Sequence, residues 1–359
     1  MRFDLDPRRS DAVHRLLAGA KLPWLAWRAA RSLASPVPRV RIPIVPRRLD
    51  GGAPSYLTEV RKRDGRIRTV GADLDWARSR AGFSTLRRRL GIFVRLLSDS
   101  AVPDGDWWID PGDEASVEGP VLGFCTRWRE TILVPDRGFV TTRGYARERR
   151  AGRAAAGFDD RDPAIMWRGG PTGIGEPFTD PMDPGSPALR QRVRLCLMLR
   201  DRPRSGPDAV DVRFARGRAV GPDLGARYEA AGILADFMPA RTWCRRRFAI
   251  DIDGNANAFS NLFIRLLYGC CVIRVASPFG FRQWYHDRLE AGRHYVPVAA
   301  DLSDLDEVIE WCRRHPADCR EIARAGQRVV MDMTCSGEMR RTVESICRRG
   351  PMAATPAAS

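Results

Sequence analysis

The spacing of apolar positions divides much of the chain into segments of strand length and segments with helical periodicity. Strand-like runs are "DWWID" (106–110), "AIMW" (164–167), "FAIDI" (248–252), "CCVIRV" (270–275) and "HYVPV" (294–298). Helical spacing occurs in "FSTLRRRLGIFVRLLSD" (83–99), "ALRQRVRLCLMLR" (188–200), "AFSNLFIRLLYG" (258–269), "FRQWYHDRL" (281–289) and "SDLDEVIEWCRRHP" (303–316). From about residue 164 to 330 strands alternate with helices, which predicts an α/β fold with a parallel sheet covered by helices. Ligands bind such sheets at the carboxyl ends of the strands.

The first 48 residues differ from the rest in pattern. Residues 11–34 combine leucines and tryptophan with basic residues, which predicts a basic amphipathic helix, and four prolines in 36–48 predict an extended linker. This helix would pack on its own protein or dock on a membrane surface, and the sequence leaves both open. The domains expected are a basic helix and Pro-rich linker (1–48), an N-terminal lobe (49–160), a C-terminal lobe (161–335), and a helix with a disordered tail (336–359).

Composition restricts the class of protein. Hydrophobic residues make up 44% of the 359 residues, and no apolar run approaches the roughly 20 residues of a membrane span. The start of the chain mixes acids and arginines and does not resemble a secretory signal, which favours a cytoplasmic location. Nine cysteines without a CxxC pair and four scattered histidines argue against a structural zinc site and a disulfide framework.

The net charge of +16 comes almost wholly from arginine, since Lys21 and Lys62 are the only lysines. Arginine enrichment is typical of a GC-rich coding background, but it would also attract an anionic surface. The arginines are spread along the chain instead of forming one basic arm with interleaved aromatic residues. We therefore expect no nucleic-acid partner.

Two turns after strands carry the groups that bind phosphates or sugars. "WRGGPTG" (167–173) is neither a Walker loop nor a clean GxGxxG motif, yet it exposes backbone N–H groups beside Arg168. In "DIDGNANAFSN" (251–261) a strand ends near Gly254, and short amides follow that both donate and accept hydrogen bonds. A plain strand-to-helix turn explains the first motif, and a well-capped helix explains the second, nearly as well. Arg245, Arg246 and Arg247 precede the strand and should lie at its other end.

Together the motifs resemble those of glycosyltransferase family 90. The resemblance rests on the stretch from "FAIDIDGNANAFSNLF" through "CCVIRVAS", "QWYHDRL" and "HYVPV" to "ADLSDLDEVIEW", preceded in order by "DWWIDPGD", "ILVPD" and "WRGGPTG". It covers roughly residues 100–335. The family includes protein O-glucosyltransferases, capsule-associated enzymes and lipopolysaccharide-modifying enzymes, and "NANAFSNLF" is similar to its bacterial branch.

The resemblance implies a GT-B type fold, in which two Rossmann-like lobes face a central cleft and the C-terminal lobe holds a UDP-sugar. It implies inverting, metal-independent transfer, with the UDP-sugar as a co-substrate and no cofactor. Asp113 of "IDPGD" matches the catalytic aspartate, whose carboxylate would take the proton from the acceptor hydroxyl. Asp110 is the nearby rival, and either aspartate could instead cap the turn after the strand.

The resemblance also places donor-binding residues. Arg168 and Arg190 match positions near the diphosphate, although Arg192 or Arg194 could take the second place. Protein O-glucosyltransferases usually carry an arginine where this chain has Asn261, so either Asn261 makes a neutral contact or Arg265 or Arg274 supplies the charge. The full donor-binding set is Arg168, Gly169, Arg190, Gly254, Asn255, Asn257, Asn261, Arg274, Ser277, Trp284 and Tyr285. His294, Asp301 and Asp304 are expected to be structural.

The function expected is transfer of a glucose- or xylose-like sugar from a UDP-sugar to a hydroxyl of a surface glycan, such as lipopolysaccharide core or capsule. The partners expected are the donor, a glycan or glycolipid acceptor, and the inner face of a membrane through peripheral contact. The alternative is a non-catalytic nucleotide- or glycan-binding protein that retains the fold.

Overall fold

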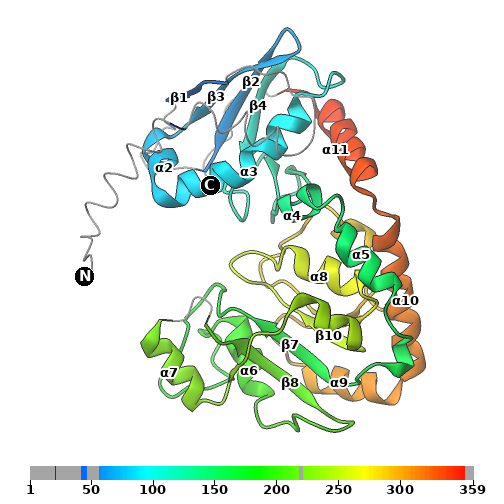
Figure 1. Ribbon diagram of the computed structural model, residues 1–359. Coiled ribbons are helices and arrows are strands. Elements are labelled where there is room, and N and C mark those ends of the chain that lie inside the picture. Colours follow the sequence, from blue (N-terminus) through cyan, green and yellow to red (C-terminus); the bar gives the residue numbers. More distant parts are fainter. Residues whose placement is uncertain (1–20, 22–41, 47–55, 218–220, 352–359) are drawn as a thin grey trace, which may run out of the picture. The chain divides into compact units, whose positions relative to one another are not determined.

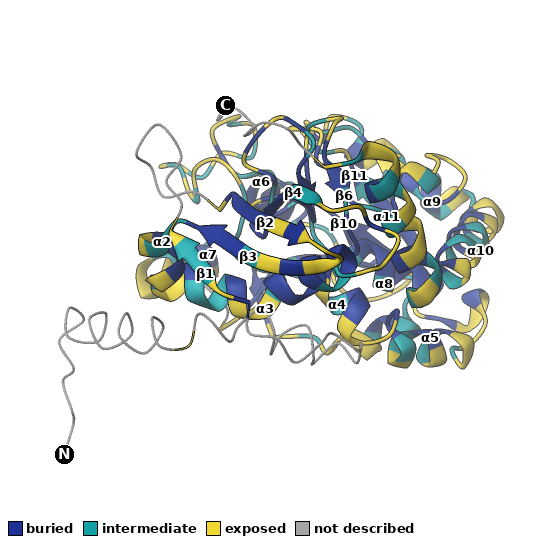
Figure 2. Cartoon of the chain, turned by 90° about the horizontal axis from the view of Figure 1, so that it is seen from above, coloured by how far each residue is buried: buried dark blue, intermediate teal, exposed yellow. Residues whose placement is uncertain are grey.

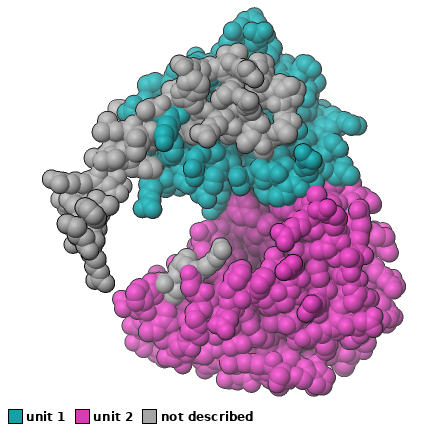
Figure 3. All heavy atoms as spheres, in the orientation of Figure 1, with its two compact units in different colours: residues 1–144, 334–359 teal, residues 145–333 magenta. Residues whose placement is uncertain are grey.

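The computed structural model describes residue 21 and residues 42–46, 56–217 and 221–351. The chain forms two compact units, residues 1–144 with 334–359 (unit 1) and residues 145–333 (unit 2), which Figure 3 distinguishes by colour. The boundary thus falls between Gly144 and Tyr145, and the C-terminal helix belongs to unit 1. The expected basic helix and proline-rich linker of residues 1–48 lie almost wholly outside the described residues, as does the tail 352–359.

Unit 1 contains a mixed six-stranded sheet in the order β1-β3-β2-β4-β5-β6. Its strands are β1 (Ile44–Pro46), β2 (Thr58–Arg63), β3 (Arg66–Ala72), β4 (Gly105–Asp110), β5 (Leu122–Gly123) and β6 (Ile132–Leu133). β2 runs antiparallel to both its neighbours, whereas β4, β5 and β6 are parallel. The carboxyl end of β4 leads directly into the loop with Asp113. Because the sheet is mixed, the expectation of a second Rossmann-like lobe stays a prediction.

The helices of unit 1 are α2 (Leu74–Arg78), α3 (Arg80–Leu97), α4 (Arg137–Thr141) and α11 (Cys335–Arg349). α3 begins where Ser79 Oγ accepts a hydrogen bond from Gly82 N, the usual role of an N-cap serine. Its apolar face is buried, and Phe93 contacts Phe124 with ring centroids 4.9 Å apart. α11 contacts α3 and β6, so the chain returns to the core of unit 1 after completing unit 2.

Unit 2 contains two parallel three-stranded sheets, β7-β8-β9 and β10-β11-β12. The strands are β7 (Ile165–Gly169), β8 (Val210–Ala215), β9 (Leu234–Ala235), β10 (Phe248–Asp251), β11 (Cys271–Val275) and β12 (Val296–Val298). They are apolar and mostly buried, as expected when helices cover both faces of a parallel sheet. The alternation of strands and helices predicted for this region is confirmed.

The first strands of the two sheets lie side by side. Asp162 N donates to Arg245 O at 3.0 Å and Arg247 N donates to Asp162 O at 2.9 Å, which forms a parallel bridge at the amino ends of β7 and β10. The spatial order is therefore β9-β8-β7-β10-β11-β12, the order of dinucleotide-binding folds. Successive strands are added on one side of β7 up to β9 and on the other side from β10 onward. The point between β7 and β10 is therefore the topological switch point, where such folds bind ligands.

The helices of unit 2 are α5 (Ala146–Arg153), α6 (Gln191–Met198), α7 (Pro222–Ala230), α8 (Ser260–Leu267), α9 (Leu305–Arg314) and α10 (Pro316–Asp332), with 3₁₀ turns η1 (Phe158–Asp160), η2 (Ala240–Arg245) and η3 (His286–Arg288). α10 packs on α8 and β11, and α5 packs on α8 (Figure 1). Figure 2 shows the strands largely buried and the outer faces of α9 and α10 exposed. One apolar core spans both sheets of unit 2.

The prediction of a helix at residues 281–289 is wrong. Only His286–Arg288 form a short 3₁₀ turn in this segment. Phe281 N donates to Ser277 Oγ, and the ring of Tyr285 packs edge-on against Phe263. These contacts hold the aromatic residues against unit 2, and no helical hydrogen-bond ladder forms. Among the described residues, no helix is both long and apolar enough to cross a membrane.

Candidate functional site

A cavity of about 130 Å³ lies at the carboxyl ends of the strands of unit 2. The loops that follow β7, β10, β11 and β12 all contribute to it, together with the first turn of α6. Its lining residues are Gly173, Ile174, Pro187, Leu189, Gln191, Arg192, Arg194, Asp253, Gly254, Pro278, Phe279 and Ala300. The cavity therefore occupies the edge of the sheet where the fold predicts a ligand.

The two turns identified in the sequence meet at this cavity. Gly173 N donates to Asn255 Oδ1 at 3.0 Å, which ties the loop after β7 to the loop after β10. A Cβ at Gly254 would lie 2.9 Å from Thr172 Oγ1 and 3.1 Å from Arg192 Nη2. A side chain at position 254 would therefore force the side chains of Thr172 and Arg192 to shift.

Three arginines around α6 hold the loops in place. Arg190 donates to the carbonyls of Gly175 and Pro171, and Arg194 donates to those of Pro184 and Asp301. Arg192 is 9% exposed and donates to Gly170 O at 3.1 Å, Thr172 Oγ1 at 2.8 Å and Ile252 O at 3.0 Å. Arg192 thus joins the ends of β7 and β10 across the switch point.

The hydrogen-bond partners of these arginines are carbonyl and hydroxyl oxygens, which carry no formal charge. Burial lowers the pKa of Arg192, while Asp251 and Asp253 act in the opposite direction. An arginine has no accessible neutral form near pH 7, so Arg192 keeps its charge beneath the cavity. Arg192 and Arg194 line the cavity, while Arg190 does not. Arg192 and Arg194, the alternatives to Arg190 as a second arginine near the diphosphate, are therefore closer to the cavity than Arg190 is.

Asp253 is the carboxylate of the cavity. Burial raises its pKa from 3.8 to about 7, although Ser277 hydrogen-bonds to the carboxylate and Arg274 and Arg192 stabilise its charge. Its Oδ2 atom is buried without a hydrogen-bond partner among the described residues. At neutral pH a large fraction of Asp253 is therefore protonated and can donate a hydrogen bond to a ligand.

Arg168 lies outside this cavity. Its guanidinium group donates to Asp211 Oδ2 and, at 2.8 Å, to Asp211 O, on the neighbouring strand β8. Burial would raise the pKa of Asp211, but hydrogen bonds from Arg213 and Arg168 outweigh it and lower the pKa. Arg168 is therefore engaged in a largely buried ion pair, and its predicted contact with a diphosphate stays a prediction. Gly169, beside it, packs so closely on Trp167 that a Cβ would lie 2.4 Å from the indole ring.

The asparagines after Gly254 shape the turn. Asn257 is buried, and its Oδ1 accepts from Phe259 N at 2.9 Å. Asn261 Nδ2 donates to Asp251 Oδ1 at 2.8 Å, at the end of β10. Arg265 lies elsewhere, because its guanidinium stacks on Trp243 with the charge 3.9 Å from the ring centre, before β10 begins. Arg265 is one of the residues considered to replace the arginine that the family carries at position 261. Its guanidinium is thus directed away from the carboxyl ends of the strands.

The segment after β11 borders the cavity through Pro278 and Phe279, and Phe279 is 39% exposed. Ser277, in the same segment, hydrogen-bonds to the carboxylate of Asp253. Arg274 Nη2 donates to His286 Nδ1 at 2.9 Å, and burial together with Arg274 and Arg282 holds the pKa of His286 well below its usual range. Arg274 is therefore held by a neutral histidine.

Trp284 and Tyr285 lie in an aromatic cluster with Phe263. Tyr285 is 0% exposed, and its hydroxyl donates to Phe259 O at 3.4 Å. A residue this deeply buried can fix the start of α8 but does not itself present a surface to a ligand. Neither ring lines the cavity.

The two candidate bases lie in unit 1 and have opposite environments. Asp110 is 1% exposed and accepts hydrogen bonds from Gly112 N at 2.7 Å, Ser116 N at 2.8 Å and Ser116 Oγ at 2.6 Å. The side chain of Asp113 is 48% exposed, and its Oδ1 accepts from Arg89 Nη2 at 2.5 Å. Asp110 thus fastens the turn, and Asp113 is presented at its surface.

The residues expected to be structural have structural contacts. His294 is buried and its Nδ1 accepts from Glu290 N at 2.9 Å, while Asp304 Oδ1 accepts from Ala299 N at 2.9 Å. Asp301 Oδ1 accepts from Ser303 N and Oγ. In the part of the chain that the structure describes, no cluster of histidine, cysteine and acidic side chains could hold a metal ion. Metal-independent chemistry remains a prediction.

Sequence reasoning missed Gln191, Asp253 and Phe279. Gln191 Nε2 donates to Ala276 O at 3.1 Å and Ala300 O at 2.7 Å, so this side chain spans the ends of β11 and β12. Its place in the first turn of α6 was the signal, since helix starts at strand ends face bound ligands. Asp253 could have been found because it directly precedes the turn glycine.

Comparisons with known proteins bear on unit 2. Residues 185–337 match the model of Glycosyl transferase family 90. The chain is 28% identical to protein O-glucosyltransferase 3 of Homo sapiens over 87 residues, which are 24% of this chain and 17% of that protein. It is 26% identical to protein O-glucosyltransferase 1 of Rattus norvegicus over 165 residues, 43% of this chain and 38% of that protein.

Two further likenesses are more limited. The chain is 41% identical over 83 residues to uncharacterized protein 179R of Invertebrate iridescent virus 6, which covers 22% of this chain and 7% of the viral protein. The solved structure of Anabaena Alr3699/HepE in complex with UDP-glucose shares 12% identity and a TM-score of 0.28, covering 35% of this chain and 36% of that one. A TM-score this low does not establish a shared fold.

The chain spans well under two thirds of each of these relatives. The family match begins at residue 185, so Asp113 and residues 170–184 of the loop after β7 lie before it. The sequence relatives are viral and animal proteins, so the assignment to a bacterial branch stays a prediction. Residues 185–337 of this α/β protein match the model of glycosyl transferase family 90, and parts of the chain are similar in sequence to protein O-glucosyltransferases.

Proposed function

We propose that the protein is a glycosyltransferase that uses a UDP-sugar and binds it in the cavity at the strand ends of unit 2. One observation carries this proposal: ten of the twelve residues that line the cavity belong to the segment that matches family 90. The cavity also lies at the switch point between β7 and β10, where α/β sheets of this order bind nucleotides.

The chemistry of the cavity suits a nucleoside diphosphate. The fixed charges of Arg192 and Arg194 and the loop beside Gly173 favour the diphosphate, because positive charge and backbone N–H groups stabilise phosphate oxygens. Phe279 and Ile174 offer exposed apolar surface for a base or a sugar face. Protonated Asp253 would donate to a hydroxyl or a phosphate oxygen.

Transfer is proposed to be inverting and metal-independent. Asp113 would accept the proton of the acceptor hydroxyl as its oxygen attacks the anomeric carbon, while the bond to the UDP oxygen breaks. The arginine charges would stabilise the negative charge that develops on the departing UDP. Asp113 suits the base better than Asp110 because its carboxylate is half exposed, whereas Asp110 is buried and accepts hydrogen bonds from its own turn.

The sugar is proposed to be glucose- or xylose-like, and the acceptor a glycan or glycolipid such as lipopolysaccharide core or capsule. A cytoplasmic location with peripheral contact at the inner face of a membrane would suit such an acceptor. These assignments rest on the sequence resemblance to the bacterial branch of the family.

A non-catalytic binder is the second candidate. Two observations favour it: Arg168 is engaged with Asp211, and Asn261, which stands in place of an arginine, donates to Asp251. Such a protein would bind UDP-glucose but would not consume it.

The decisive experiment is UDP release from a panel of UDP-sugars, with and without EDTA, alongside direct measurement of binding. We expect UDP-glucose or UDP-xylose to bind and turn over at the same rate in EDTA. Binding without UDP release, with acceptors supplied, would favour the second candidate. Activity that disappears with EDTA and returns with manganese would contradict the metal-independent mechanism.

A further inference from the structure

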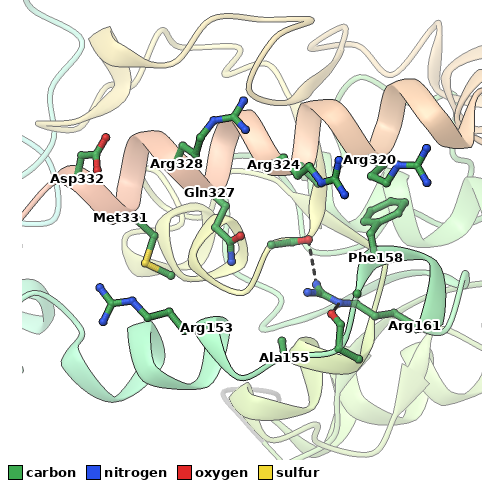
Figure 4. Close-up of a pocket in the computed structure, with 15 residues that line it drawn as sticks. Arg153, Ala155, Phe158, Arg161, Arg320, Arg324, Gln327, Arg328, Met331 and Asp332 are labelled. Carbon is green, nitrogen blue, oxygen red and sulfur yellow. Dashed lines mark hydrogen bonds between the residues drawn. The ribbon is translucent and has the colours of Figure 1, made fainter.

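A second cavity in unit 2 has a volume of about 400 Å³ and shares no lining residue with the first. It lies between α10 on one side and the end of α5 with its following loop on the other (Figure 4). Gln327 and Met331 reach from α10 toward that loop. The volume is within the range of small-molecule sites.

Arginine dominates the lining. Three of the arginines are spaced four residues apart, which places them on one face of α10. The cavity contains one carboxylate, Asp332, against five arginines: Arg153, Arg161, Arg320, Arg324 and Arg328. Counting also Asp159 and Glu321, which pair with Arg320 and Arg324, two positive charges remain in excess.

The arginines divide into structural and available groups. Arg161 is buried, and it donates to Ala156 O at 2.9 Å, Tyr268 O at 2.8 Å and Gly269 O at 2.9 Å. Arg161 therefore forms part of the wall. Arg324 makes an exposed pair with Glu321 at 2.9 Å, a contact of little energetic weight. Arg153 and Arg328 show no hydrogen bond or ion pair to any of the described residues.

The walls are fixed by packing. A Cβ at Gly152 would lie 2.0 Å from Leu267 O, so the backbone of α5 rests directly on the end of α8. Gln327 Nε2 donates to the same carbonyl at 2.9 Å, which joins α10 to that end. A cavity built by three helices in contact exists before any ligand arrives, which lowers the ordering cost of binding.

We propose that this cavity binds a phosphomonoester, with the guanidinium groups of Arg153, Arg324 and Arg328 as donors. Guanidinium groups match phosphate oxygens in bidentate geometry, and three such groups exceed the charge of the carboxylate beside them. The same phosphate chemistry occurs in a soluble metabolite and in a lipid headgroup. This site goes beyond the proposed sugar transfer and takes a ligand of its own.

The test uses the full chain and two probes with the same group. Glycerol 3-phosphate binding is measured by calorimetry, and vesicles of phosphatidylcholine with about 20 mol% phosphatidic acid are tested by flotation. The variant is Arg324→Gln with Arg328→Gln. The matched control is Arg204→Gln with Arg293→Gln, which removes the same charge from exposed positions of unit 2 outside both cavities.

We expect the wild type to bind at least one probe and the variant to bind it about tenfold more weakly, with UDP-glucose affinity unchanged. Binding of glycerol 3-phosphate identifies a soluble ligand, and binding of vesicles alone identifies a lipid headgroup. The proposal is overturned if neither probe binds, or if the control pair loses as much affinity as the variant. Melting curves of both double variants show whether either fold is perturbed.

Discussion

At the scale of single residues, Asp110 and Asp113 lie three positions apart in the chain but have opposite environments. Asp110 is enclosed by the turn it fastens, and burial raises its pKa although three hydrogen bonds act against this. Asp113 stands half exposed with Arg89 beside it. A base must reach a substrate, so the exposure of Asp113 favours it over Asp110 for the proposed role.

The first prediction compares the two asparagine variants. Asp113→Asn should reduce transfer about 100-fold or more, because the amide cannot accept the acceptor proton. Its stability should change by less than about 1 kcal/mol, the usual range for a partly exposed ion pair. Asp110→Asn should lower stability by about 1–3 kcal/mol through its lost hydrogen bonds, with turnover per folded molecule nearly unchanged. Rates of UDP release and urea unfolding measure both.

A normal rate in Asp113→Asn together with a loss of stability would assign Asp113 to the turn. The base would then have to be another residue.

Asp253 gives a prediction about pH. The pKa of Asp253 in the folded protein is about 7, whereas that of an exposed aspartate is 3.8. The neutral carboxyl therefore contributes its full share to the free energy of unfolding below about pH 4, and this contribution is lost as the pH rises through 7. A bound diphosphate adds negative charge and favours the neutral carboxyl further. UDP-glucose affinity should therefore fall roughly tenfold between about pH 6 and pH 8.

UDP-glucose is the right probe because its diphosphate keeps a constant charge over this range. Asp253→Asn should bind it with little pH dependence, while the exposed Asp301→Asn should keep the wild-type profile. An unchanged profile in Asp253→Asn would show that another group titrates.

At the scale of elements, the site depends on two loops that approach within contact distance. Arg192, at the start of α6, links the loop after β7 to the end of β10. Gly173 and Asn255 add a second link. A change that forces these loops apart should weaken ligand binding before it unfolds the sheet.

Gly254→Ala makes this change. The added Cβ would meet Thr172 Oγ1 and Arg192 Nη2, so both must move. We expect UDP affinity to fall by about tenfold with a stability loss of about 1–3 kcal/mol, the cost of overpacking. Gly170→Ala is the control, because its Cβ would meet no atom within 4 Å. Equal affinities in the two variants, measured by calorimetry, would show that the loop contact does not serve binding.

At the scale of the whole molecule, unit 2 is one continuous stretch of chain with its own core, whereas unit 1 is assembled from both ends of the chain. The cavity that we propose for the donor lies wholly within unit 2, so we expect donor binding to change the amide exchange of unit 2.

Hydrogen exchange tests this division. With UDP-glucose alone, amides in residues 170–176, 253–258 and 276–280 should exchange about tenfold more slowly, because binding suppresses local opening. Peptides from unit 1 and from residues 153–161 should be unchanged. Protection that appears only in unit 1 would place the donor elsewhere and contradict the proposed site.

Local pattern by itself determined the alternation of strands and helices after residue 164, the strand that ends at Asp110 and the glycine turns. These features depend on side-chain periodicity and on residues such as Gly254 whose conformation or size is special, and both can be read along the chain. The helix expected at 281–289 failed because aromatic residues with helical spacing were held instead by contacts with Phe263 and Ser277.

Only the tertiary structure decided which charged residues are available to a ligand. Arg168 is engaged because β8 brings Asp211, 43 positions away, beside it. The pKa of Asp253 is raised because neighbouring loops bury the carboxyl group. Tyr285 is fully buried by residues packed around it and so cannot contact a ligand. An arginine's partner and an aspartate's solvation depend on what the fold packs against them, and this depends on contacts between residues far apart in the chain.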